Sequence, residues 1–471
     1  MHFGTGGWRA VIADEFTKEN LQILAAAMAA KMKHEGVCSE GIVIGYDRRF
    51  LSKEAMRWLA EVFAAEGIHA YLISHSCPTP LAMFYVQSRG MHYGMMVTAS
   101  HNPAIYNGVK VFTYGGRDAD LEQTADIERY AAEVHVPTDY IDYEMAVSRG
   151  LIEEIDPIND YLDSILTDMN VSAIRKACLH VALDPMYGVS ETSIRTILMT
   201  ARCEVDTIHG RHDPLFGGHL PAPNEAGLKE LGNYVVRNSC DLGIATDGDA
   251  DRIGVVDDKG RYLSPNDILV LLYWYLVKYR GMKGPCVRNL CTTHRLDRLA
   301  QQLGEQCYEV PVGFKWVSAK MEETGAIIGG ESSGGMAIQG RIKGKDGIYA
   351  AALLVEMLAV TGRKMSEIFD DLSVQIGSAY MAEHSYRFHP EQREQFLHLI
   401  MTEKQFPKLP RRMEDVSYMD GCRICFEGGG WVSIRFSGTE PLLRVFCEME
   451  HPEEAEEICE CYRRFLDLEQ E

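Results

Sequence analysis

The sequence has few positive charges, and this shortage excludes one class of partner. Its 471 residues include 47 lysines and arginines against 68 aspartates and glutamates, a formal net charge of −21. Nucleic acids are bound through clustered basic side chains that contact phosphates, so we expect no nucleic-acid partner. A small phosphorylated ligand is still compatible with this charge if a few basic side chains gather locally.

Long hydrophobic runs are also absent. The longest uninterrupted apolar run covers residues 268–277 and stops at Asp267 and Lys278. A membrane-spanning helix needs roughly 20 apolar residues, so we predict a buried helix here and no membrane segment. Residues 1–4 lack a charged stretch followed by an apolar one, so nothing indicates secretion. We therefore expect a cytoplasmic protein whose 13 scattered cysteines are reduced.

A complete zinc motif is missing as well. Cys422 and Cys425 form a Cys-x-x-Cys pair, but the sequence has no second pair of this spacing. Residues 421–426 have the pattern of a strand, in which side chains at an odd spacing point to opposite faces. The ligand set is incomplete, so we predict no metal at this pair and leave its role open.

The length and the order of the elements predict several α/β domains. One hydrophobic core stops growing at roughly 250–300 residues, so this chain should contain more than one. Three segments alternate strands with helices, and in each a strand leads directly into a polar loop. The loops lie at residues 95–102, 242–252 and 327–335. Ligands of such sheets bind at the carboxyl ends of the strands, so the three loops should face one cleft.

The most informative loop places a hydroxyl and an imidazole at the end of a strand. Residues 94–97 are predicted as a buried strand, and residues 97–103 read Val-Thr-Ala-Ser-His-Asn-Pro. Lys110 lies in the next strand-like run. A hydroxyl such as Ser100 on a tight turn, with a cation nearby, is what phosphoryl transfer through serine requires. A capped turn without any chemistry is the alternative.

Three carboxylates alternate in the second loop. Asp247, Asp249 and Asp251 follow a strand at residues 242–245. Oxygen ligands at this spacing suit Mg²⁺. A calcium-binding EF-hand needs glycine at the sixth position of its loop, where this chain has Arg252, so we exclude calcium storage. A solvated Asp/Gly turn is the other alternative.

Three further segments carry weaker signals. In residues 329–335, Glu331 and the serines could hydrogen-bond sugar hydroxyls. Residues 435–444 combine two arginines with a small-residue turn, which suits a phosphate dianion. Residues 4–9 read Gly-Thr-Gly-Gly-Trp-Arg. This segment is not a dinucleotide fingerprint, because no strand precedes it and its third glycine is misplaced.

Together these five motifs resemble, in order, those of the α-D-phosphohexomutase superfamily, the family of phosphoglucomutase and phosphomannomutase. The resemblance runs from Phe3 to Arg444. It implies three similar α/β domains with mixed sheets and a smaller α+β C-terminal domain, around a central cleft. We expect a phosphoserine domain at 1–145, a metal-binding domain at 146–252, a sugar-binding domain at 253–368 and a phosphate-binding domain at 369–471.

The resemblance also implies a role for each matched residue. Ser100 is the phosphoserine and, with Asp247, Asp249 and Asp251, a ligand of Mg²⁺. Arg9 faces the phosphoserine, and Arg252 is the adjacent active-site cation. The implied sugar and phosphate ligands are Glu331, Ser333, Arg435, Ser437, Gly438, Thr439 and Arg444.

The group that moves the proton is left open. Some family members have an acid–base histidine where this chain has Gly335. Lys315 matches a lysine that other phosphoglucomutases use instead. Lys110 is a second candidate base if its pKa is lowered. His101 either removes the proton or positions the phosphate, and the sequence does not rank the three.

The implied reaction interconverts hexose 1-phosphate and hexose 6-phosphate through phospho-Ser100 and a hexose 1,6-bisphosphate. We expect glucose first, with glucose 1,6-bisphosphate as activator and intermediate, and mannose second. Phosphoglucosamine mutases commonly have glycine in place of Ala250, but a phosphoglucosamine mutase remains an alternative. A haloacid-dehalogenase-type phosphotransferase using Asp247 and a catalytically silent relative are the others. A monomer or a homodimer is expected.

Overall fold

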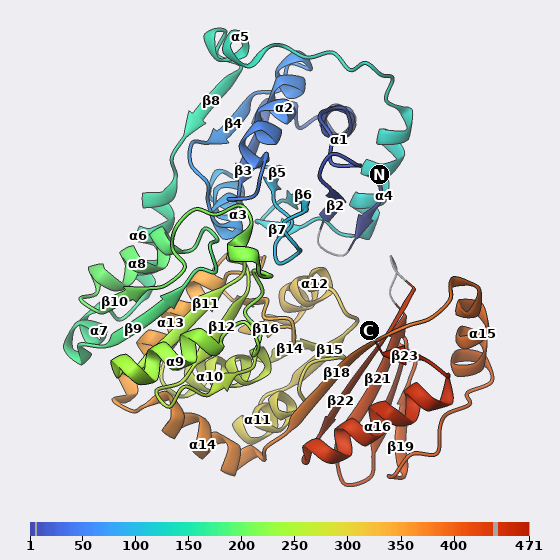
Figure 1. The fold of residues 1–471 in the computed structure, drawn as a ribbon. Helices are drawn as coiled ribbons and strands as arrows, with labels where there is room; N and C mark the ends of the chain where they lie inside the picture. Colours follow the sequence, from blue (N-terminus) through green and yellow to red (C-terminus); the bar gives the residue numbers. More distant parts are fainter. Residues whose placement is uncertain (5–6, 437–440, 471) are drawn as a thin grey trace.

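The computed structural model describes residues 1–4, 7–436 and 441–470 (Figure 1). Four sheets follow one another along the chain, and each belongs to a different segment. In Figure 1 the first segment is at the top, the second and third are at the lower left, and the C-terminal segment is at the lower right. None of the helices in these ranges is both long enough and apolar enough to cross a membrane.

The first sheet has eight strands, in the order β1-β2-β6-β5-β3-β4-β8, with β7 paired to β6. Its strands are β1 (Phe3–Gly4), β2 (Gly7–Val11), β3 (Ile42–Tyr46), β4 (Ala70–Ile73), β5 (Tyr93–Val97), β6 (Tyr106–Thr113), β7 (Arg117–Asp118) and β8 (Ile152–Ile155). Its helices are α1 (Lys18–Glu35), α2 (Ser52–Ala65), α3 (Thr79–Arg89), α4 (Leu121–Glu133) and α5 (Tyr143–Ser148). β3, β4, β5 and β8 pair in parallel, whereas β6 runs antiparallel to β5, so the sheet is mixed. β3 and β5 are buried along their whole length, as expected for strands covered on both faces.

The second sheet has the order β10-β9-β11-β12-β13. Its strands are β9 (His180–Asp184), β10 (Glu204–Thr207), β11 (Leu242–Thr246), β12 (Ile253–Val256) and β13 (Tyr262–Leu263). Its helices are α6 (Ile158–Asp168), α7 (Val171–Ala177), α8 (Glu191–Thr200) and α9 (Lys229–Asn238). β10, β9 and β11 are parallel, and β12 then returns antiparallel to β11. The loop between β11 and β12 therefore lies at the carboxyl end of the parallel strands.

The third sheet, β15-β14-β16-β17, repeats this layout. Its strands are β14 (Cys286–Asn289), β15 (Cys307–Val310), β16 (Ile328–Gly330) and β17 (Met336–Ile338). Its helices are α10 (Pro265–Lys278), α11 (Arg295–Leu303), α12 (Phe314–Thr324), α13 (Gly347–Thr361) and α14 (Met365–Ile376). The predicted buried helix at 268–277 is confirmed as part of α10, which begins with a capping box formed by Ser264 and Asp267.

The fourth sheet is antiparallel, in the order β19-β20-β21-β22-β18-β23. Its strands are β18 (Tyr380–Arg387), β19 (Met413–Ser417), β20 (Cys422–Phe426), β21 (Trp431–Phe436), β22 (Leu442–Met449) and β23 (Glu469–Gln470), and its longer helices are α15 (Arg393–Leu397) and α16 (Pro452–Phe465). The predicted strand with Cys422 and Cys425 is confirmed as β20. Cys422 is buried in the core beneath α16, and Cys425 lies on the other face, against a small cluster that includes Leu290.

The cores show how the domains are joined. One large hydrophobic cluster runs continuously from α3 through the second sheet to α13, whereas the C-terminal domain has a core of its own. Polar contacts tie that domain to the third: Asp420 accepts a hydrogen bond from the backbone of Val312, and Glu448 from that of His294. The C-terminal domain thus has a core of its own but is joined to the third domain by these hydrogen bonds and by the small cluster that includes Leu290.

The domain limits are best placed where the sheets end. β8 lies beyond the expected boundary at 145 but pairs with β4, and β12 and β13 lie beyond 252 but extend the second sheet. We propose limits after Ile155, after Leu263 and before Tyr380, which keep every sheet whole.

Candidate active site

Ser100 sits on the turn after β5, with its side chain directed at the second domain. Its hydroxyl donates to Oδ2 of Asp247 at 2.6 Å and lies 3.4 Å from Nδ1 of His101. The residue is fully buried and has φ = +52°, a left-handed conformation that costs a non-glycine residue free energy. The surrounding structure must therefore impose this conformation.

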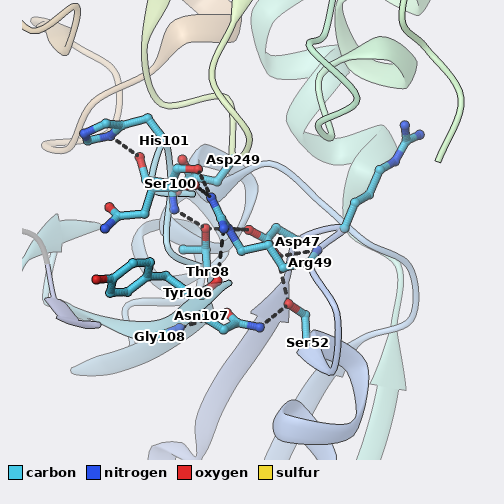
Figure 2. Close-up of polar contacts among 12 residues, drawn as sticks. Asp47, Arg49, Ser52, Thr98, Ser100, His101, Tyr106, Asn107, Gly108 and Asp249 are labelled. Carbon is cyan, nitrogen blue, oxygen red and sulfur yellow. Dashed lines mark hydrogen bonds and ion pairs between the residues drawn. The ribbon is translucent and has the colours of Figure 1, made fainter. Parts of the chain in front are cut away.

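A buried arginine holds the turn in place. Figure 2 shows Arg49 beneath the loop, where one terminal nitrogen donates to the carbonyls of Ser100 and Asn102, at 2.7 and 2.6 Å. The other donates to those of Pro103 and Tyr106, at 2.9 and 3.0 Å. Four carbonyls of one short loop thus converge on a single guanidinium.

Asp47 extends this network on the other side. Its carboxylate accepts hydrogen bonds from the hydroxyls of Thr98 and Ser52, at 2.7 and 2.8 Å (Figure 2). The Thr98 hydroxyl in turn accepts the backbone N–H of Ser100 at 2.8 Å. Sequence reasoning missed both Asp47 and Arg49, because they follow β3, far from Ser100 in the chain. The polar residues just after a buried strand were the available signal.

The three aspartates of the second loop form one buried cluster. The ligand oxygens of Asp247, Asp249 and Asp251 all lie within 4.8 Å of one another. Burial and the charges of the other two carboxylates raise the pKa of Asp247. One oxygen of Asp249 and one of Asp251 are buried without a hydrogen-bond partner. Unpaired carboxylate oxygens directed at one another fit a hard divalent cation such as Mg²⁺.

Lys110 reaches this cluster from the neighbouring domain. Its ammonium lies 2.7 Å from Asp249 and 2.5 Å from Asp251. Burial alone would lower the pKa of Lys110, but the two carboxylates outweigh it and raise the pKa. Thr79 adds a hydrogen bond to Asp249 at 2.5 Å. Lys110 is therefore held in its charged form.

Two arginines and a histidine surround Ser100. Nε of Arg252 lies 3.9 Å from carboxylate oxygens of Asp247 and Asp251, and Arg9 is hydrogen-bonded to Asn102. The charge of Arg252, then burial and the charge of Arg9, hold the pKa of His101 well below its ordinary value. His101 is thus neutral at physiological pH.

A second lysine, which sequence reasoning did not assign, completes the cluster. Lys345 lies in the third domain, just before α13, and its ammonium is 2.8 Å from the carboxylate of Asp251. Its aliphatic part passes over Gly335, where an added Cβ atom would lie 2.2 Å from Cδ of Lys345. The absence of a side chain at 335 therefore lets this lysine reach the aspartates.

The third loop is tied to α12. Oε1 of Glu331 accepts hydrogen bonds from Asn289 at 2.9 Å and from the backbone of Gly313 at 3.0 Å. Ser333 is exposed, and its carbonyl accepts a hydrogen bond from Arg252 at 3.4 Å. Lys315, in the first turn of α12, has a pKa lowered by burial. The sugar-binding role expected of this loop stays a prediction.

The expected phosphate-binding residues lie apart from this cluster. Arg435 and Arg444 are cross-strand partners on β21 and β22, and Arg435 forms an ion pair with Asp420 at 2.9 Å. Ser437, Gly438 and Thr439 fall outside the described residues. Burial raises the pKa of Glu383 on β18, and the positive charges of Arg444 and Arg252 partly oppose this rise.

Comparison with known proteins identifies the class. Four family models match in order, described as domains of phosphoglucomutase/phosphomannomutase: α/β/α domain I at 1–136, domain II at 159–260, domain III at 264–375 and the C-terminal domain at 397–463. The chain is an enzyme of the phosphohexomutase class. It belongs to the phosphoglucomutase/phosphomannomutase family, within the α-D-phosphohexomutase superfamily.

Full-length relatives carry several names. A phosphoglucomutase/phosphomannomutase from Thermococcus kodakarensis is 28% identical and covers 99% of this chain, which covers 98% of that protein. A phosphoglucosamine/phosphogalactosamine mutase from Sulfurisphaera tokodaii is 27% identical over 95% of this chain and 94% of its own. The crystal structure of a "putative phosphomannomutase" from Thermus thermophilus superimposes with a TM-score of 0.86 at 28% identity, over 99% of both chains.

Proposed function

We propose that the protein interconverts glucose 1-phosphate and glucose 6-phosphate through a phosphorylated Ser100. The observation that carries this proposal is the buried Ser100 hydroxyl, 2.6 Å from a carboxylate of a three-aspartate cluster and surrounded by cations. A serine hydroxyl this close to a cluster of carboxylates that can bind a metal ion is well placed for phosphoryl transfer.

The cycle moves one phosphoryl group at each step. The bond between phosphorus and Oγ of Ser100 breaks as a bond to the free sugar hydroxyl forms, which gives glucose 1,6-bisphosphate. The bisphosphate then turns over, and its other phosphoryl group returns to Ser100 as the opposite sugar oxygen takes up a proton. Mg²⁺, held by Asp247, Asp249, Asp251 and the Ser100 oxygen, would offset negative charge on the group in transfer.

The charges around Ser100 support separate roles for the candidate bases. Lys110 is held protonated by two carboxylates, so we assign it as a fixed cation together with Arg9 and Arg252. His101 is neutral and lies next to the hydroxyl, and the pKa of Lys315 is lowered. We therefore assign the removal of the sugar hydroxyl proton to His101 or Lys315.

The distal phosphate requires a second basic site. Arg435, Arg444 and residues 437–439 supply it in this proposal, from the C-terminal domain, whose main core is its own. Because Arg435 is paired with Asp420, a substrate phosphate must replace or share that partner.

A phosphoglucosamine mutase is the second candidate, favoured by the name of the relative from Sulfurisphaera tokodaii. The test is a comparison of kcat/KM on the 1-phosphates of glucose, mannose and glucosamine. We expect the highest value for glucose, and a higher value for either competitor would replace it as the substrate.

Phosphopeptide mapping separates the chemistry from its rivals. We expect acid-stable phosphate on Ser100 and loss of nearly all mutase activity in Ser100→Ala. Acid-labile phosphate on Asp247 would instead establish the dehalogenase-type alternative, and absence of both phosphate and activity would establish a silent relative.

A further inference from the structure

Three chemically different side chains meet at the edge of the second sheet opposite Ser100. His180 begins β9, Asp206 lies in β10 and Cys240 shortly precedes β11. Nε2 of His180 is 2.8 Å from Oδ2 of Asp206 and 3.7 Å from Sγ of Cys240. The three donor atoms all lie within 4.8 Å of one another. Asp247 follows the other end of β11, so this group is separate from the aspartate cluster.

Rigid backbone positions all three residues. The backbone N–H of His180 donates to the carboxylate of Asp241, and the N–H of Asp241 donates to the carbonyl of His180, both at 2.8 Å. Cys240 is fixed by a backbone bond to Val235, at the end of α9. Asp206 belongs to the parallel ladder between β10 and β9. Donors on fixed elements lose little conformational freedom when they bind an ion.

The donor set selects one class of ion. An imidazole nitrogen, a carboxylate oxygen and a thiolate sulfur are the three ligand types of zinc, at bond lengths of about 2.0–2.3 Å. Tetrahedral geometry at these lengths places neighbouring donors about 3.3–3.6 Å apart, so the separations of 2.8 and 3.7 Å need only a small adjustment. Mg²⁺ prefers oxygen ligands only, and the aspartate cluster suits it better.

The local charge also favours a cation. Burial, followed by the charges of Asp206, Asp241 and Glu204, raises the pKa of Cys240 to about 11. Cys240 is buried, while His180 and Asp206 keep part of their side-chain surface open to water.

We propose that His180, Asp206 and Cys240 bind a zinc-class divalent ion, with a water molecule as the fourth ligand. Such an ion would fasten three adjacent strands together, on the side of the sheet away from the sugar phosphate. The other explanation is a His180–Asp206 hydrogen bond beside a neutral thiol, with no ion. This proposal does not depend on the mutase activity.

Cobalt titration distinguishes the two explanations. The full-length protein is saturated with Mg²⁺ and titrated with Co²⁺, while thiolate-to-cobalt charge-transfer absorption is recorded. We expect the band to saturate at about one equivalent, because the three donors form a single site. It should disappear in Cys240→Ser and persist in Cys203→Ser, a matched change at another buried thiol of the same domain.

A thermal measurement supplies the second readout. Zinc should raise the melting temperature of the wild type in a concentration-dependent way, because binding stabilises only the folded state. His180→Gln should remove this shift in melting temperature. This second variant also tests the site if Cys240→Ser does not fold. The absence of the charge-transfer band in the wild type, or its survival in Cys240→Ser, would overturn the proposal. Metal at the aspartate cluster cannot produce the band, since no sulfur is part of that cluster.

Discussion

Replacing Arg49 tests whether the buried network imposes the conformation of Ser100. Arg49→Lys keeps the positive charge but replaces a planar fork by a single nitrogen with three donors. One ammonium cannot reach four carbonyls that are now spread over both terminal nitrogens of Arg49. The loop should relax, and Ser100 should leave its left-handed conformation for part of the time.

The contacts set the size of the effect. Loss of one or two hydrogen bonds to a charged group should lower the free energy of unfolding by about 2–3 kcal/mol in Arg49→Lys. Arg49→Ala should cost about 3–5 kcal/mol, because Asp47 is then left buried without its cation. Holding Ser100 at φ = +52° costs roughly 1–3 kcal/mol. If the loop relaxes and Ser100 leaves this conformation, the enzyme should lose a similar amount of transition-state stabilisation. This loss corresponds to a fall in kcat of about 10–100-fold.

Steady-state kinetics with a hexose 1-phosphate, alongside denaturant unfolding, gives both quantities. We expect kcat to fall in Arg49→Lys while KM changes little, since the arginine contacts no substrate-binding residue described above. Arg48→Lys is the matched control, because Arg48 is adjacent but turns away to the carbonyl of Gly210. A variant Arg49→Lys that is less stable yet keeps the wild-type kcat would show that the network only supports the fold.

Four further outcomes are expected. Because the pKa of Asp247 is raised, the folded, metal-free protein keeps a proton that the unfolded chain releases above about pH 4. The free energy of unfolding of the metal-free protein should therefore fall as the pH rises towards that raised pKa. Mg²⁺ binding at neutral pH should then release a proton, measurable by calorimetry in buffers of different ionisation enthalpy, and undiminished release in Asp247→Asn would refute this. Glu331→Gln should reduce the transition-state stabilisation measured by kcat/KM by roughly 1–3 kcal/mol, with Ser100 still phosphorylated. Unchanged kinetics would assign the loop a structural role only. Arg435→Lys should weaken calorimetric binding of hexose 6-phosphate without affecting Mg²⁺, and equal affinities would remove Arg435 from the phosphate site.

Local sequence patterns marked the loops of the site, and the family resemblance supplied their expected roles. Ser100, Asp247 and Glu331 each lie within three residues of the end of a short buried strand, which the structure shows to be β5, β11 and β16. A change from apolar to small and polar residues is visible within a few positions. The confirmed strand β20 and the helix at 268–277 depend on the same short-range periodicity.

Residues that act through long-range packing were not predictable in this way. Arg49 meets the Ser100 loop only because β3 and β5 are neighbours in the sheet. Lys345 meets Asp251 only because the third domain packs on the second. β8 pairs with β4 although several helices and strands separate the two in the chain, so this pairing is not visible in the local sequence either. A single sequence does not contain the distances that create these contacts.

Gly335 and Lys345 constrain how this site can be altered. Because the lysine stem occupies the volume that a side chain at 335 would need, any side chain at 335 requires Lys345 to move. A chimera that took the 329–335 loop from a relative with a bulky residue at 335, and kept Lys345, would displace this lysine from its ion pair with Asp251. Libraries aimed at new sugar specificity should therefore vary both positions together, or hold Gly335 constant and vary its neighbours.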